Sequence, residues 1–130
     1  MIKITLGKKA FKEFLKAEYL LKQRKISESS QLLHHTINKN SGLKIIPLIS
    51  LRRVILLLKM KKFDQALDQI VSIENSLLSD KSIIMTGQIY EQIYNDNEKA
   101  MEYYMRIINN YTNSIYFEPV RYHIRMLNSG

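Results

Sequence analysis

The chain has 130 residues, 45% of them hydrophobic, and it contains no cysteine, four glycines and two prolines. This composition excludes a disulfide scaffold, a loop-rich fold and a disordered chain, and the length predicts one domain with its own core. The longest uninterrupted apolar run, residues 54–58, is far shorter than the roughly 20 residues of a membrane-spanning helix, so we expect no membrane span.

The formal net charge of +8 is unevenly distributed along the chain. Residues 1–62 hold 15 Lys and Arg against three acidic residues, a net charge of +12, whereas residues 63–130 hold five against nine, a net charge of −4. Such asymmetry bears on the choice of partner and on solubility, and it carries no information about the fold.

Apolar residues recur at helical spacing along most of the chain and are separated by short polar turns. The pattern predicts an all-α protein without strands. We expect a lead-in at 1–7, helical hairpins at about 8–40, 47–78 and 80–111, and a last helix at about 115–127. Pro47 suits the first turn of the third helix, and Pro119 falls in or just after the first turn of the last one.

The most informative stretch is residues 83–112, which reads Ile83-x-x-Thr86-Gly87-x-x-Tyr90, then Ala100-x-x-x-Tyr104, then Thr112. Small residues allow two antiparallel helices to approach closely, and aromatic rings fill the volume around them. We therefore expect Gly87 and Ala100 to form the closest helix contact, with Tyr90 and Tyr104 packed beside it.

This spacing resembles the tetratricopeptide repeat, a helical hairpin of about 34 residues. Ala66 and Ser29 occupy the slot filled by Ala100, at intervals of 34 and 37 residues, and the third repeat has one extra residue between Tyr90 and Ala100. The resemblance implies a right-handed superhelix, or solenoid, of about three hairpins closed by a C-terminal capping helix.

The last repeat and the final helix look like the C-terminal repeats of long bacterial tetratricopeptide proteins, many of which are exported to the cell envelope. That likeness implies a periplasmic or envelope location if this chain is a piece of a longer protein. Otherwise we expect a cytoplasmic one, because residues 1–7 do not form the apolar segment of a signal peptide.

Motifs for catalysis or cofactor binding are not found. The sequence has no phosphate-binding glycine loop, no nucleophile elbow and no HExxH motif, so we expect no enzyme and no cofactor. His34 and His35 are adjacent on a helix and point about 100° apart, without Cys or acidic residues at metal-ligand spacing, so we expect no metal site there. His123 stands alone on the last helix.

The favoured function is a protein-interaction scaffold in which the first helices of the hairpins line a concave groove for a peptide or partner helix. The partner is a protein or peptide, and an acidic one would suit the basic residues. The family register gives these groove candidates: Lys22, Arg52, Ile55, Lys59, Gln88 and Glu91. Arg52 is the leading candidate, because its guanidinium lies in an otherwise apolar helix and must reach the groove or pair with an acid.

Two alternatives remain open. The chain is the structural end of a longer solenoid, with its basic half docked on preceding acidic repeats, or it binds nucleic acid or another polyanion through that half. Nucleic acid is the less favoured partner, because the tyrosines that could stack on bases lie in the acidic half of the chain.

Overall fold

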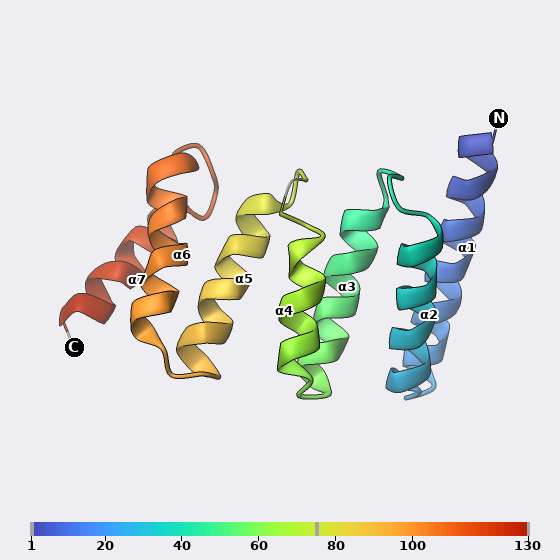
Figure 1. Ribbon diagram of the computed structural model, residues 1–130, viewed down its shortest axis with the longest axis horizontal. Helices are drawn as coiled ribbons and strands as arrows, with labels where there is room; N and C mark the ends of the chain where they lie inside the picture. Colours follow the sequence, from blue (N-terminus) through green and yellow to red (C-terminus); the bar gives the residue numbers. More distant parts are fainter. Residues whose placement is uncertain (1, 75, 130) are drawn as a thin grey trace. The chain divides into compact units, whose positions relative to one another are not determined.

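The computed structural model describes residues 2–74 and 76–129, and every regular element in this part of the chain is an α-helix (Figure 1). The all-α class predicted from the sequence is therefore confirmed. The helices are α1 (Ile2–Lys22), α2 (Ile26–Lys39), α3 (Ile46–Lys59), α4 (Phe63–Val71), α5 (Ser79–Gln92), α6 (Asn97–Asn110) and α7 (Phe117–Ser129).

The chain divides into two compact units, Met1–Ile73 with α1 to α4 and Glu74–Gly130 with α5 to α7. Within each unit, consecutive helices run in opposite directions and pack against each other (Figure 1). The units carry opposite net charges, +10 (15 basic, 5 acidic) and −2 (5 basic, 7 acidic), which sum to +8.

Three helix ends differ from the sequence prediction. α1 begins at Ile2 and not at Lys8, so residues 2–7 continue the helix. Gly7 costs a helix only about 1 kcal/mol relative to Ala and does not by itself end it. α7 begins at Phe117, and Pro119 lies in its first turn. Backbone N–H groups in the first turn have no acceptor within the helix, so a proline there removes no hydrogen bond.

α4 was expected to reach residue 78 but ends at Val71. The backbone tightens there, because the N–H groups of Ser72 and Ile73 donate to carbonyls three residues earlier, at 3.2 and 2.9 Å. The Ser72 hydroxyl also donates to the Gln69 carbonyl at 2.7 Å, which satisfies an acceptor at the helix end.

The turns inside the three hairpins share one backbone feature, a left-handed residue. Arg24, Lys61 and Asn95 each follow the first helix of a hairpin and have positive φ angles of 64°, 59° and 55°. They are separated by 37 and then 34 residues, the same intervals that separate Ser29, Ala66 and Ala100. A left-handed residue is a common way to end a helix, so the chain uses one helix–turn–helix design three times.

The hydrogen bond that closes each turn locates the extra residue of the third repeat. In the first two hairpins the closing N–H, of Lys25 or Lys62, donates to a carbonyl five residues earlier, at 2.9 and 2.8 Å. In the third, the Asp96 N–H donates to the Tyr90 carbonyl, six residues earlier, at 2.8 Å. The insertion therefore lies between Tyr90 and Asp96, at the end of α5.

The small residues of the repeat pattern are buried in the hairpins. Ala66 and Ala100 are fully buried, and the Ser29 hydroxyl donates to the Ala17 carbonyl at 2.7 Å across the α1–α2 contact. Each unit has its own apolar cluster. Buried members are Ala17, Leu33, Ile37, Ile46, Ile49 and Leu56 in the first unit, and Ile83, Ile84, Ala100, Tyr104, Ile107 and Val120 in the second.

Candidate binding site

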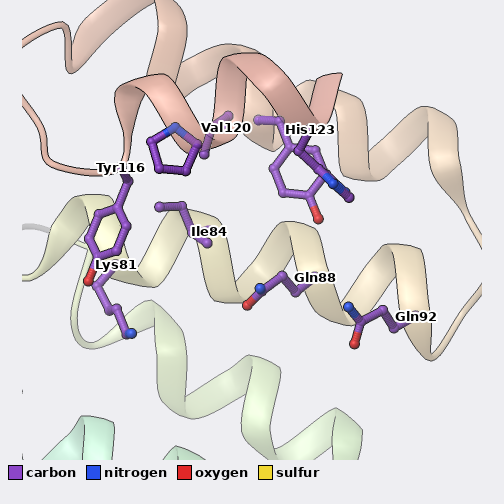
Figure 2. A pocket seen from close by; sticks show the side chains of 9 residues that line it. Lys81, Ile84, Gln88, Gln92, Tyr116, Val120 and His123 are labelled. Carbon is purple, nitrogen blue, oxygen red and sulfur yellow. The ribbon is translucent and has the colours of Figure 1, made fainter. Parts of the chain in front are cut away.

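An open pocket of about 250 Å³ lies between α5 and α7 in the second unit (Figure 2). Side chains of α5 form one wall, and side chains of α7 and the turn before it form the other. Its lining residues are Lys81, Ile84, Gln88, Gln92, Tyr104, Tyr116, Pro119, Val120 and His123.

The pocket combines an apolar floor with polar groups at its rim. Ile84 and Val120 are buried and face each other from the two helices. Gln88 and Gln92, one turn apart on α5, are exposed, and Figure 2 shows their amides projecting from the same face of the helix. An amide both donates and accepts hydrogen bonds, so this row can pair with the polar groups of a peptide backbone.

Lys81 stands at the opposite end of the pocket from Gln92 (Figure 2). Its ammonium lies 5.5 Å from the centroid of the Tyr116 ring, within the range of a cation–π interaction. This contact positions a positive charge beside the apolar floor. The arrangement can bind an apolar side chain together with hydrogen-bonding groups and a carboxylate.

A cluster of three side chains joins α5, α6 and α7, and two of them, Tyr104 and His123, line the pocket. Glu91 Oε1 accepts from the Tyr104 hydroxyl at 2.7 Å and lies 2.7 Å from His123 Nε2. The Tyr104 and His123 rings meet edge to face, with centroids 5.3 Å apart. Burial opposes ionisation of Glu91, but its hydrogen bonds from His123 and Tyr104 outweigh burial, and the pKa of Glu91 is lowered.

The ionised Glu91 carboxylate only accepts hydrogen bonds, so the His123 ring donates from Nε2. Burial, together with the hydrogen bond to Glu91 and its negative charge, raises the pKa of Tyr104 well above its ordinary value. The three groups therefore satisfy one another, and the cluster holds α7 against α5.

The two walls of the pocket are tied at the other end as well. Ser114, just before α7, donates its hydroxyl hydrogen to Asp80 of α5 at 2.7 Å. The hydroxyls of Tyr111 and Ser79 lie 3.1 Å apart. Because hydrogen bonds join α7 and its preceding turn to α5 at both ends, the pocket is preorganised.

The ring of Tyr104 also explains the glycine of the repeat pattern. A β-carbon built on Gly87 would lie 2.6 Å from Tyr104 Cε1 and 3.0 Å from Cδ1. The sequence predicts the closest helix approach between Gly87 and Ala100, and the atoms nearest to a β-carbon at residue 87 belong to the Tyr104 ring. Gly87 is thus required by the aromatic ring that covers it.

Tyr90 of α5 packs against α6 in the same hairpin. Its ring stacks on Tyr103 of α6 with centroids 5.7 Å apart, and the Lys99 ammonium lies 4.8 Å from its centroid. Tyr90 is half-buried and belongs to the partly buried side chains around the second unit's apolar cluster. The extra residue of this repeat lies between Tyr90 and Asp96.

The remaining groove candidates lie in the first unit. Arg52 makes a bidentate ion pair with Glu18 of α1, with Nε–Oε1 and Nη2–Oε2 distances of 2.6 and 3.1 Å. Of the two roles expected for this guanidinium, the structure therefore shows pairing with an acid. Lys22 and Lys59 are exposed and Ile55 is half-buried.

Sequence reasoning missed His123. It stands 32 residues from Glu91, and nothing close to it in sequence indicates a partner. Only the repeat period could have indicated that His123 lies near α5. It places α7 one repeat after α5, in the position of the first helix of a further hairpin. The family register predicts that Glu91 faces the groove, and its carboxylate accepts hydrogen bonds from Tyr104 and His123.

The adjacent histidines of α2 are both exposed. His34 Nε2 lies 3.2 Å from the Asn38 amide, and desolvation and the charge of Arg53 lower the pKa of His34. Among the described residues, no three His, Asp or Glu side chains gather closely enough to hold a metal ion. Nor is any helix within residues 2–74 and 76–129 long and apolar enough to cross a membrane.

Comparison with known proteins gives no relative: no protein-family model, curated protein or solved structure matches this chain.

Proposed function

We propose that this chain is a non-catalytic protein-interaction module of the tetratricopeptide-repeat type, whose hairpins form a solenoid and whose first helices bind a peptide. The pocket between α5 and α7 is the observation that carries this proposal. A left-handed residue in each of three hairpin turns, and small buried residues at matching intervals, support the family assignment.

The rim of the pocket favours an extended peptide. Gln88 and Gln92 are four residues apart, which is about 6 Å along a helix at 1.5 Å per residue. Two residues of an extended chain span about 6.8 Å at 3.4 Å per residue. The two amides therefore match the backbone groups of residues i and i+2 of a peptide that runs along α5.

The floor of the pocket supplies specificity. An apolar side chain of the peptide fills the space between Ile84 and Val120, and a carboxylate of the same peptide approaches the Lys81 ammonium. Because hydrogen bonds already hold the two walls, binding orders few protein groups.

Glu91, Tyr104 and His123 have the side chains of an acid–base site, yet their contacts favour a structural role. Tyr104 is 2% exposed, and its hydroxyl hydrogen is directed at Glu91. Because its pKa is raised, the Tyr104 hydroxyl stays protonated near neutral pH and does not accept a proton as a base would. We therefore assign this cluster to positioning α7.

A selection from a random peptide library displayed on phage tests the proposal. The chemically synthesised winning peptide is expected to bind wild type and to bind the double variant Gln88→Ala, Gln92→Ala at least about tenfold more weakly, since two hydrogen-bonded amides are removed. Gln65→Ala, at an exposed glutamine of α4, is the control and should bind as wild type does. Equal affinity of the double variant and wild type would refute the proposed site.

A further inference from the structure

The face of α1 that points away from its unit carries an exposed apolar row. Phe11, Leu15 and Tyr19 follow one another at intervals of four residues, so they line one side of the helix. Their exposed fractions are 49%, 50% and 61%. Three large apolar side chains in one row are unusual on a solvated helix and indicate a binding surface.

This outward face is also uniformly basic. Five exposed lysines flank or interleave the apolar row: Lys8, Lys9, Lys12, Lys16 and Lys22. The two acidic residues of α1 are turned elsewhere, because Glu13 accepts a hydrogen bond from Thr36 of α2 and Glu18 pairs with Arg52 of α3. No carboxylate within the described part of α1 neutralises the lysines.

Comparison with α3 indicates what this face is not built to receive. Ile46, Ile49 and Leu56 of α3 are buried within the first unit's apolar cluster, to which α2 also contributes. The residues 37 positions earlier, at the interval of this repeat, are Lys9, Lys12 and Tyr19. Two lysines in place of two isoleucines would be costly to bury against another helix. The face of α1 therefore does not repeat the apolar face by which α3 joins the first unit's cluster.

We propose that α1 binds peripherally to an anionic lipid bilayer through the face formed by Phe11, Leu15, Tyr19 and the five lysines. The apolar side chains enter the boundary between headgroups and acyl chains, and the lysine ammoniums remain among the lipid phosphates and carboxylates. Aromatic rings are well suited to this boundary. The helix lies in the plane of the surface and does not cross it.

A bilayer fits this face better than an acidic protein or a nucleic acid. The face belongs to a single helix. A protein partner would need a complementary groove to cover it, whereas a fluid lipid bilayer adapts to its shape. Nucleic-acid phosphates would use the lysines but leave Leu15 without a partner. The combination of an apolar row and flanking lysines is typical of interfacial helices. It favours a lipid bilayer over other polyanions as the partner of this face.

Co-sedimentation with vesicles tests this inference. The full chain is expected to sediment with vesicles in which phosphatidylserine is about one third of the lipid, and to remain in solution with pure phosphatidylcholine. Lys12→Gln with Lys16→Gln should weaken binding about 30-fold, from about 1 kcal/mol per lysine. Lys61→Gln with Lys62→Gln is the control, because it changes the net charge equally at two exposed lysines outside α1.

The variant Phe11→Ser with Leu15→Ser separates the bilayer from other polyanions. It keeps every charge and alters only half-exposed side chains, so circular dichroism should show an unchanged fold. Loss of vesicle binding by this variant supports the inference. Vesicle binding equal to that of wild type, equal losses in the α1 and control lysine variants, or binding only to an oligonucleotide or polyglutamate would overturn it.

Discussion

The contact between Gly87 and Tyr104 gives the sharpest prediction for stability. A β-carbon at residue 87 would lie 2.6, 3.0 and 3.2 Å from three ring atoms of Tyr104, whereas carbon atoms in contact prefer about 3.5–4.0 Å. The ring cannot easily yield by that amount, because it is 2% exposed and its hydroxyl is bonded to Glu91. In Gly87→Ala we therefore expect about 1–3 kcal/mol of overpacking strain.

Gly7→Ala is the matched control for this substitution. Both glycines lie inside helices, so both variants gain helix propensity of up to about 1 kcal/mol. No atom that the structure describes lies within 4 Å of a β-carbon built on Gly7, so only the variant at Gly87 is expected to be strained. The difference between the two changes in unfolding free energy then reports the strain alone.

Urea unfolding followed by circular dichroism measures both free energies. We expect Gly7→Ala to be as stable as wild type or more so, and Gly87→Ala to lie about 1–3 kcal/mol below Gly7→Ala. In a Tyr104→Ala background, the penalty at Gly87 should disappear, because the obstructing ring is gone. Equal stability of the two alanine variants would refute the role assigned to Gly87.

Three further predictions concern charges. Arg52→Glu should lower the free energy of unfolding by about 1–2 kcal/mol, because it breaks the bidentate pair with Glu18 and sets two carboxylates together. The double variant Arg52→Glu with Glu18→Arg, which exchanges both charges, should restore that free energy. An unchanged urea midpoint for Arg52→Glu would contradict the ion pair. Because the pKa of Glu91 is lowered in the fold, its ionised carboxylate stabilises the fold at pH values above the ordinary glutamate pKa of about 4.3. This contribution is lost as the pH falls below that value. Wild type should therefore lose stability more steeply in acid than Glu91→Gln. Because the pKa of Tyr104 is raised in the fold, its protonated hydroxyl contributes stability that is fully present below about pH 10 and is lost as the pH rises further. Tyr104→Phe should therefore lose less stability in alkali than wild type in the same unfolding assay. Parallel curves for the two proteins would contradict the bond to Glu91.

Periodicity in the sequence was sufficient to predict the helices and their pairing into hairpins. Helical spacing of apolar residues and polar turns are local signals, so the all-α class and the seven helices within residues 2–74 and 76–129 followed from them. The helix ends were less predictable. α1 extends through Gly7 to Ile2, and α4 stops at Val71 because of hydrogen bonds that no sequence pattern specifies.

The candidate site depended on contacts between distant residues. Gln88 was placed on the groove face from the repeat register, and it lines the pocket. Arg52 was also a groove candidate, but whether its guanidinium pairs with Glu18 depends on side-chain geometry between α1 and α3. The partnership of Glu91 with His123 requires the packing of α7, which a single histidine in a sequence does not indicate.

An NMR titration of the ¹⁵N-labelled chain with the selected peptide tests the central claim most directly. If the peptide lies along α5, the side-chain amide signals of Gln88 and Gln92 should shift on binding, together with backbone signals of Ile84 and Val120. Signals of Gln65 on α4 should stay in place. Shifts confined to the first unit, with the signals of Gln88 and Gln92 unchanged, would contradict the assignment of the pocket between α5 and α7 as the peptide-binding site.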